Sequence, residues 1–261
     1  MSSAASNGIH VRNIAGYSVS SMAPKLIVFA SGTAEGGSSS TTPLGFSKTM
    51  HRQENLGGGS GFENLVKSPD LKADIVAVVS NHEHGGVRAR AERLNVPFVH
   101  FPAPWDAEHY ASVLQKTAIG NGWVALSGWF KFVHGLNPAK TFNVHPALLS
   151  FDNGRFGGRA MFGPRMHEAV REAFERGEIT ESGCTMHFVT DEYDRGPAFF
   201  EYRVPLSKGM VPDDIAQAVN NVKHEWQPRI TNMVVHGEIS WDGKNPQTLK
   251  VPAGYEYFPK L

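Results

Sequence analysis

Cysteine is almost absent from this 261-residue chain, and its one cysteine, Cys184, cannot form an internal disulfide. Long apolar runs are missing too, since none approaches the roughly 18–20 residues that span a bilayer. Charge of neither sign is in excess, because 25 Lys and Arg residues balance 25 Asp and Glu residues. These absences exclude a disulfide-stapled domain and a transmembrane helix, and they give no basis for binding nucleic acid or a membrane. A reducing, cytoplasmic compartment is the expectation.

Acidic residues are also missing from the start of the chain, where the first is Glu35. Residues 1–24 are rich in serine and small side chains, and we predict a disordered leader there. An organelle-transit peptide is the alternative, since such peptides avoid acids. Residues 31–61 are dominated by Gly, Ser and Thr without a hydrophobic period, which predicts a long loop.

Short apolar runs alternate with helical patterns along the rest of the chain. Strands are expected at 25–30, 74–80, 97–101, 122–127, 141–144, 184–189 and 197–206, and helices at 62–71, 86–94, 106–118, 165–176 and 213–235. Apolar strands that alternate with helices predict an α/β fold with a doubly wound, mostly parallel, Rossmann-like sheet in one domain over 25–261. The tail, about 236–261, has a DG turn between β-rich runs and predicts a hairpin.

The segment FNVHP, residues 142–146, ends one of these strands with an amide and an imidazole. Asn143 and His145 face the same side, because strand residues two apart do so. In a doubly wound sheet the site lies beyond the carboxyl ends of the strands. An amide there can stabilise an oxyanion, and a histidine can move protons near neutral pH. The alternative is turn chemistry, with Asn143 capping and His145 packed.

A carboxylate that orients His145 would favour catalysis. HFVTDEYDRGP, residues 187–197, supplies three acids after a later strand, namely Asp191, Glu192 and Asp194. Chain position alone does not say which of them meets His145, and the run can equally be a solvated turn. No metal is expected, because the two histidines and one glutamate of HEH, residues 82–84, are a weak ligand set on a loop.

Several segments together resemble a known family. FNVHPALLSF, the helix MHEAVREAFERGE and GCTMHFVTDEYDRGP resemble the formyltetrahydrofolate-dependent formyltransferases. SNHEHGGVRARAERLNVP, ALSGWFKFV and FGGRAMFGPRMHEAV are also similar, so the resemblance runs from about Lys25 to Gly243. N-x-H-P followed at this separation by D-x-G-P is a specific signal. The pattern is most similar to the branch of the family that formylates glycinamide ribonucleotide in purine biosynthesis.

The resemblance implies transfer of a formyl group from 10-formyltetrahydrofolate, a co-substrate, to the amine of glycinamide ribonucleotide. Asn143 matches the amide that hydrogen-bonds the formyl oxygen and then the oxyanion. His145 matches the imidazole that assists proton movement, and Asp194 matches the carboxylate that pairs with it. Arg195 stands where the family commonly has glycine.

For the folate, the resemblance implies main-chain binding at Lys131, Phe132 and Val133, with Thr190 and Asp191 in the opposite wall. Ordinary core packing is the alternative for Phe132.

For the acceptor phosphate, the resemblance implies a loop after the first strand that opens a helix, where backbone amides hold an anion. The matching residues are Ser31, Gly32, Gly59, Ser60 and Gly61. They are split by an insertion at about 33–56, which either folds over the site or hangs free.

For the acceptor ribose, the long C-terminal helix carries Lys223 where the family has a glutamate that binds the hydroxyls. Asn220, one turn earlier, is expected to point at the ligand. This departure makes the acceptor less certain than the reaction.

Three alternatives remain open. A formyltetrahydrofolate deformylase uses a similar residue set, but the leader is short for its extra domain. A formyltransferase for another sugar amine is compatible with Lys223. A non-catalytic folate-binding protein would not need the Asn-His-Asp set. In each case the expected partners are small molecules, and the chain is a monomer or homodimer.

Overall fold

The computed structural model describes residues 23–32, 57–117, 119–159 and 161–257. The leader expected at 1–24 lies almost wholly outside the described residues, and the insertion expected at about 33–56 lies outside them as well. Both expectations stay predictions.

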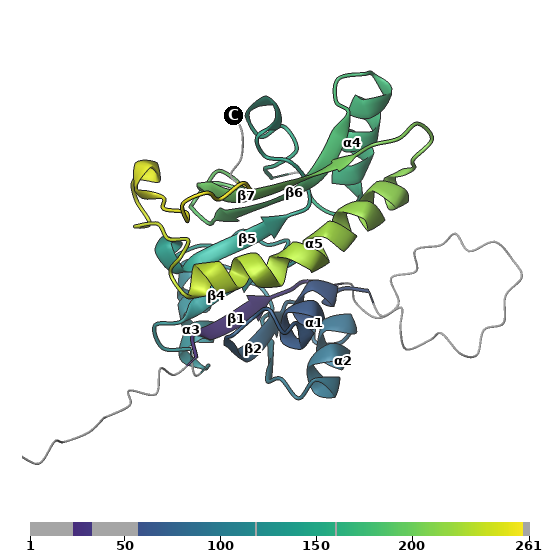
Figure 1. Cartoon of the computed structure of the whole chain (residues 1–261). Helices are drawn as coiled ribbons and strands as arrows, with labels where there is room; N and C mark the ends of the chain where they lie inside the picture. Colours follow the sequence, from purple (N-terminus) through teal and green to yellow (C-terminus); the bar gives the residue numbers. More distant parts are fainter. Residues whose placement is uncertain (1–22, 33–56, 118, 160, 258–261) are drawn as a thin grey trace, which may run out of the picture.

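The core of the molecule is one seven-stranded sheet with the order β3-β2-β1-β4-β5-β6-β7 (Figure 1). Neighbours from β3 to β5 are parallel, whereas β6 runs antiparallel to β5, and β7 runs antiparallel to β6. This confirms the predicted α/β class and the mostly parallel sheet. The strands are β1 Lys25–Phe29, β2 Asp74–Ser80, β3 Phe98–His100, β4 Trp123–Leu126, β5 Thr141–His145, β6 Glu181–Phe188 and β7 Ala198–Pro205.

Helices cover both faces of the sheet (Figure 1). Strand β1 shows why its sequence is apolar throughout: Leu26 and Val28 enter the core on one face, whereas Ile27 and Phe29 enter the core on the other. The first core also receives side chains from α1, α2, α4 and α5, and the second receives them from α3. The helices are α1 Ser60–Lys67, α2 Gly86–Arg93, α3 Ala107–Gln115, α4 Pro164–Glu175 and α5 Pro212–Val235.

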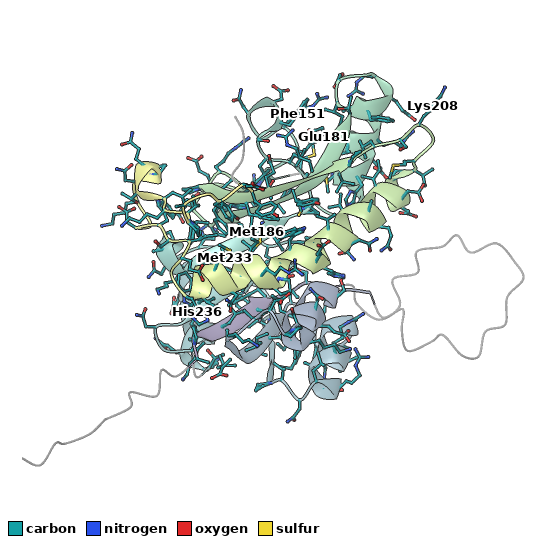
Figure 2. All side chains as sticks on the ribbon, in the orientation of Figure 1. Phe151, Glu181, Met186, Lys208, Met233 and His236 are labelled. Atoms are coloured by element: carbon teal, nitrogen blue, oxygen red, sulfur yellow. The ribbon has the colours of Figure 1, made fainter. Side chains whose placement is uncertain are left out.

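The longest helix, α5, lies along the sheet. Figure 2 shows Lys208 before its N-terminus and His236 after its C-terminus, at opposite ends of the helix. Met186 of β6 is fully buried, and Met233 of α5 packs against the same core. None of the helices in the described part of the chain combines the length and apolarity needed to cross a bilayer.

The tail after α5 forms less sheet than its sequence predicts. In its described part, the hairpin expected at 236–261 reduces to one antiparallel bridge between Ser240 and Lys250. Inside the bridge, the Asp242 carboxylate accepts hydrogen bonds from the backbone N–H groups of Lys244 and Asn245, both at 2.8 Å. Local turn chemistry therefore replaces strand pairing.

The sheet also fixes where a ligand can enter. Strand β1 pairs with both β2 and β4, so the strand order reverses between β1 and β4. The carboxyl ends of these strands are tied together, because Ser31 N donates to Gly128 O at 2.8 Å and Phe130 N donates to Ser31 Oγ at 3.0 Å. Open α/β sheets bind ligands at such a switch point.

Candidate active site

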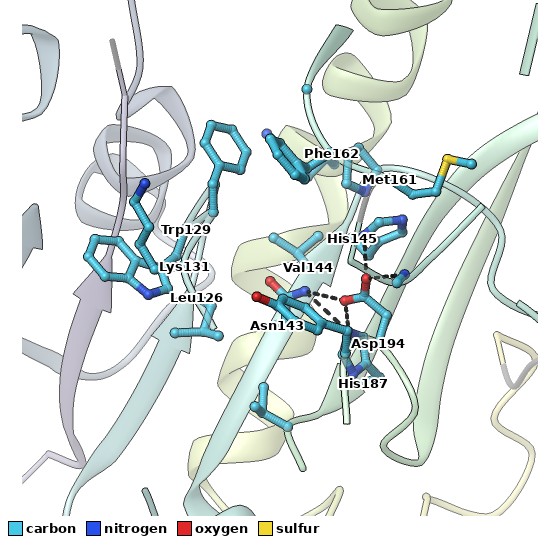
Figure 3. Close-up of a pocket in the computed structure, with 18 of the residues that line it drawn as sticks. Leu126, Trp129, Lys131, Asn143, Val144, His145, Met161, Phe162, His187 and Asp194 are labelled. Atoms are coloured by element: carbon cyan, nitrogen blue, oxygen red, sulfur yellow. Dashed lines mark hydrogen bonds and ion pairs between the residues drawn. The ribbon is translucent and has the colours of Figure 1, made fainter. Parts of the chain in front are cut away.

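The end of β5 carries the Asn143 and His145 side chains into one pocket. Strand pairing places His187 of β6 directly opposite Asn143, and Thr185 opposite His145. Figure 3 shows Asn143, His145, His187 and Asp194 gathered on one side of the pocket. His187 was not predicted as a site residue. The sequence places His187 in a strand but does not say which β5 residue lies opposite it. That becomes known only from the register between β5 and β6.

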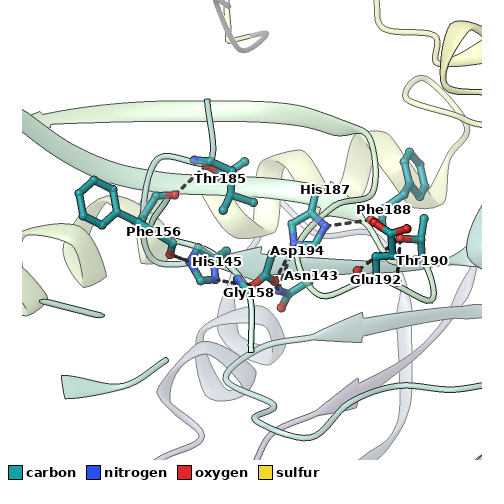
Figure 4. A network of polar contacts seen from close by, with 12 residues as sticks. Asn143, His145, Phe156, Gly158, Thr185, His187, Phe188, Thr190, Glu192 and Asp194 are labelled. Atoms are coloured by element: carbon teal, nitrogen blue, oxygen red, sulfur yellow. Dashed lines mark hydrogen bonds and ion pairs between the residues drawn. The ribbon is translucent and has the colours of Figure 1, made fainter. Parts of the chain in front are cut away.

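Of the three acids after β6, Asp194 is the one that meets the β5 residues. Its Oδ1 lies 3.4 Å from Asn143 Nδ2 and 3.4 Å from His187 Nε2. Its Oδ2 accepts a hydrogen bond from Gly158 N at 2.9 Å and lies 3.7 Å from His145 Nδ1 (Figure 4). The backbone of Asp194 is left-handed, with φ of 52°, a conformation that aspartate tolerates better than most residues.

The His145 ring has a defined tautomer. Its Nε2 lies 2.7 Å from the carbonyl oxygen of Phe156, which can only accept, so Nε2 carries the proton. In the neutral ring, Nδ1 is then the free basic nitrogen, and it faces the Asp194 carboxylate. A proton taken up at Nδ1 would be stabilised by that negative charge.

Burial and charge act in opposite directions on this pair. Burial alone would raise the pKa of Asp194, but the hydrogen bond to His187 and the nearby charges of His145 and His187 hold that pKa well below its usual range. Burial lowers the pKa of His145, and the charge of Asp194 offsets only part of this effect. At neutral pH the pair is therefore a carboxylate beside a neutral imidazole.

His187 completes the polar cluster. Its Nδ1 lies 2.9 Å from the carbonyl oxygen of Phe188, so Nδ1 donates. Its Nε2 lies 3.2 Å from Asn143 Nδ2 and accepts from that amide when the ring is neutral. When the ring is protonated, Nε2 donates to Asp194 instead. The Asn143 amide thus has its N–H groups turned toward Asp194 and His187 rather than away from them.

Arg195 fits its position without disturbing Asp194. Its guanidinium donates to the carbonyl oxygen of Asn153 at 2.5 Å and lies against Gly154. A Cβ on Gly154 would come within 2.0 Å of the Arg195 guanidinium, so the glycine makes room for the arginine.

The pocket has a volume of about 520 Å³, within the usual range for small-molecule sites. The predicted folate residues Lys131, Phe132, Val133 and Thr190 line it, whereas Asp191 does not.

The wall at 129–133 is held from outside the pocket. Tyr110 OH donates to Phe132 O at 2.9 Å, and Trp129 Nε1 donates to Tyr110 OH at 2.9 Å. At the mouth, Phe130 and Phe162 are 42 % and 44 % exposed, and their rings stack at 5.6 Å. An apolar, aromatic wall of this kind suits a flat heteroaromatic ligand.

The opposite end of the pocket is built by α5 and α4. Asn220 and Lys223, both predicted substrate residues, line it together with Asp213 and Gln217. These four positions form one stripe, since they recur at three- and four-residue spacing. His167 of α4 joins them. Burial lowers the pKa of Lys223 to about 8 and that of His167 to about 4.

The predicted phosphate residues Ser31, Gly32, Gly59, Ser60 and Gly61 do not line this pocket. The two glycine segments do meet, because a Cβ on Gly58 would lie 2.0 Å from Gly32 Cα. The Ser60 hydroxyl lies 3.2 Å from His224 Nε2.

Gly61 is buried where α1 packs against α5 and against Ser127, the residue that follows β4. A Cβ there would come within 2.2 Å of Ser127 Oγ and 3.2 Å of Gln227 Oε1. The glycine therefore has a packing role in this chain.

A metal site is not evident in the described ranges: no cluster of three or more His, Cys, Asp or Glu side chains there is arranged to hold an ion.

Comparison with known proteins gives a consistent result. The family model described as "Formyl transferase" matches residues 56–231. Phosphoribosylglycinamide formyltransferase of Escherichia coli (strain K12) is 31% identical over 197 residues, which are 70% of this chain and 85% of that protein. The chloroplastic phosphoribosylglycinamide formyltransferase of Arabidopsis thaliana is 29% identical over 199 residues, 71% of this chain but only 65% of that relative's own length.

A solved structure shows the same fold. The crystal structure of phosphoribosylglycinamide formyltransferase from Anaplasma phagocytophilum has a TM-score of 0.66 at 21% identity, covering 90% of this chain and 98% of that one. The residues matched by the family model include the β5 end and the loop that carries Asp194.

Proposed function

This chain belongs to the formyl transferase family, and from that relationship we propose that it transfers the formyl group of 10-formyltetrahydrofolate to the amine of glycinamide ribonucleotide in purine biosynthesis. The family comprises 10-formyltetrahydrofolate-dependent enzymes that act on small molecules. The acceptor, the pathway and the residue roles are our proposal. The observation that carries it is the cluster of Asn143, His145 and Asp194 in one pocket.

The reaction makes one carbon–nitrogen bond and breaks another. The acceptor amine attacks the formyl carbon, negative charge builds on the formyl oxygen, and the bond to the folate nitrogen then breaks. The amine nitrogen loses a proton and the folate nitrogen gains one. The enzyme therefore needs a donor for the oxyanion and a group that moves a proton between the two nitrogens.

Asn143 is proposed as the oxyanion donor. Its Nδ2 is the only part of the side chain that can donate, and its N–H groups are directed at Asp194 and His187 in this structure, so one of them must turn to the formyl oxygen when the folate binds. A donor placed where the charge develops typically accelerates such reactions by about 10²–10³.

His145 is proposed as the proton carrier through Nδ1. The Phe156 carbonyl fixes the tautomer, and Asp194, ionised at neutral pH, stabilises the protonated ring. Gly158 N and His187 hold the carboxylate in place. Asp194 thus positions His145 and offsets its charge.

Binding of the folate is proposed at the wall formed by Lys131, Phe132 and Val133, with Thr190 opposite. The acceptor is proposed at the end lined by Asn220 and Lys223. A different sugar amine is the second candidate acceptor, and Lys223 favours it, since a lysine there supplies a donor and a positive charge. The cytoplasmic location and the monomer or homodimer state stay predictions.

A spectrophotometric assay with a 10-formyl folate donor, run with and without glycinamide ribonucleotide, tests the proposal. Folate product that forms only with the ribonucleotide is the expected result. Product without any acceptor would identify a hydrolase instead. Product with another sugar amine but not with glycinamide ribonucleotide would keep the reaction and replace the acceptor.

A further inference from the structure

Lys223 is an unusual residue to find in the wall of this pocket. It lies on the fourth turn of α5, on the stripe that faces the cavity, and is partly buried. Within the described residues it makes no hydrogen bond and no ion pair. A buried ammonium without a partner is unfavourable, because it loses water without gaining an acceptor. An unpaired charge that faces a ligand cavity is thus open to a ligand.

The groups around Lys223 supply no negative charge near it. Cys184 of β6 is buried, and burial raises the pKa of its thiol to about 12, so it stays neutral. His167 of α4 and His224 of α5 are the other titratable neighbours, and both have pKa values lowered to about 4, chiefly by burial. The acid on the same stripe, Asp213, lies ten residues earlier, about 15 Å along the helix.

His167 provides a second unpartnered polar group at the same place. Its side chain is buried and lines the pocket, and its Nδ1 has no hydrogen-bond partner. Burial is the main cause of the lowered His167 pKa; the charges of His145 and Lys223 lower that pKa further and the charge of Asp213 raises it, so His167 lies near all three groups. A ligand atom between His167 and Lys223 would therefore sit beside the proposed reaction centre.

We propose that Lys223 and His167 form an acceptor subsite for an oxyanion, a phosphate or a carboxylate carried by the amine that receives the formyl group. This inference rests on the proposed function, because it names a chemical feature of the acceptor. The Lys223 ammonium supplies the positive charge. His167 donates one hydrogen bond from Nδ1 when the neutral ring carries its proton on that nitrogen. Binding of the anion satisfies both groups at once.

Other positive groups do not compete for this role. The second lysine in the pocket wall, Lys131, lies over the Trp105 ring at 4.3 Å and belongs to the folate side. The N-terminus of α1 is outside the pocket wall, and Ser60 at its start is engaged with His224. Among the described residues, Lys223 is thus the cation best placed to meet an acceptor anion.

Protection of Lys223 from chemical modification tests the subsite without any formyl transfer. The full chain is treated with an amine-acylating reagent, and the modification of individual lysines is measured by peptide mass mapping. Inorganic phosphate, acetate, neutral ribose and sodium chloride of matched ionic strength are compared as protecting ligands. Lys208, which projects at the turn before α5, is the internal reference (Figure 2).

Saturable protection of Lys223 but not of Lys208 is the expected result. Protection by phosphate alone assigns a phosphate, protection by acetate alone assigns a carboxylate, and protection by both assigns a general oxyanion site. Equal modification of Lys223 in all four solutions, or protection by ribose alone, would overturn the proposal.

Calorimetric titration of variants with the protecting anion gives a second readout. Lys223→Gln should weaken anion binding about tenfold or more, and Lys223→Arg should retain most of it. Lys208→Gln removes the same charge from an exposed position and should bind the anion as the natural chain does. Equal weakening in the Lys208 and Lys223 variants would contradict a specific subsite.

The failure of this inference can be told from the failure of the proposed function. Anion protection in a chain that transfers no formyl group would keep the subsite and remove the function. Formyl transfer with unprotected Lys223 would keep the function and remove the subsite.

Discussion

The basic nitrogen of His145 decides how the cluster can work. Because Nε2 of His145 donates its proton to Phe156 O, with 2.7 Å between nitrogen and oxygen, only Nδ1 is left to accept a proton. Nδ1 faces Asp194. The ring must be neutral to accept that proton. Activity should therefore depend on the pKa of His145, which burial lowers from its usual value.

The pH dependence follows from this arrangement. We expect kcat/KM to fall on the acid side as His145 becomes protonated, with a midpoint below the usual histidine value of about 6.5. Asp194→Asn removes the negative charge that raises the His145 pKa, so the acid limb should move to lower pH while the maximum rate falls. A limb that moves to higher pH, or stays in place, would contradict the pairing of Asp194 with His145.

The amide of Asn143 can be tested by truncation. Asn143→Ala should lower kcat by about 10²–10³, because the oxyanion loses a donor, while binding of the folate changes little. Pre-steady-state rates and a fluorescence titration with the folate separate the two effects. The unfolding midpoint serves as the control for folding. A rate within a few fold of the natural chain would remove Asn143 from the mechanism.

Pairing of β5 with β6 shows what the sequence can and cannot predict about the site. Asn143 and His145 could be predicted as neighbours because strand alternation is local. The same reasoning left Asp191, Glu192 and Asp194 as equal candidates, and only the resemblance favoured Asp194. The contacts of Asp194 and the position of His187 depend on strand register, which is set by tertiary packing.

Element boundaries show the same limit. Strand β6 begins at Glu181 rather than at 184, because it continues to pair with β7 beyond the apolar run. Helix α5 runs through Pro228, which is buried against the core rather than ending the helix. In both cases tertiary contacts outweigh local propensity.

Thr185 links β6 to the loop that follows His145. Its hydroxyl donates to Ala147 O at 2.7 Å and accepts from Leu149 N at 3.0 Å, while Glu201 accepts from Ser150 N at 3.1 Å. These bonds hold the chain just after β5, on which the orientation of His145 depends.

Removal of the Thr185 hydroxyl should therefore affect both stability and rate. Thr185→Val should lower the free energy of unfolding by about 1–3 kcal/mol, since it leaves buried backbone groups unpaired, and should also lower kcat. Thr185→Ser retains the hydroxyl and should restore most of both. Urea denaturation and steady-state kinetics on the two variants make the comparison. If Thr185→Ser loses as much stability and rate as Thr185→Val, the methyl group of Thr185, rather than its hydroxyl, is the important group.

For the molecule as a whole, the sheet architecture was predictable and the strand order was not. Apolar strands such as β1 predict burial on both faces, and the structure confirms this. The antiparallel direction of β6 and β7 cannot be predicted from their own sequences. It depends on the end of the sheet at which the chain re-enters after α4. The end of the pocket at Lys223 is a similar case, since α4 and α5 are brought together only by the fold.

Buried and half-buried histidines make the whole fold sensitive to acid. His145, His167 and His224 have lowered pKa values in the folded chain, so their contribution is present above the unfolded value of about 6.5 and is lost as pH falls. We expect the free energy of unfolding to decline from about pH 6.5 to about 4. Below about 3.8, protonation of Asp194 removes a further contribution, because its pKa is also lowered.

Urea denaturation between pH 4 and 8 measures this decline. Each histidine contributes up to about 1.4 kcal/mol per pH unit to the slope. His224→Gln should reduce the slope, whereas the exposed variant His84→Gln should leave it unchanged. Stability that does not change between pH 6.5 and 4 would contradict the assigned burial of these rings.

The most direct measurement follows the formyl carbon itself. The chain is supplied with 10-formyltetrahydrofolate labelled with ¹³C in the formyl group, together with glycinamide ribonucleotide, and the products are identified by mass spectrometry and NMR. We predict that the label appears on the amine of the ribonucleotide, and that Asn143→Ala slows its appearance. Label that appears as free formate whether or not the ribonucleotide is present would contradict formyl transfer and identify a hydrolase.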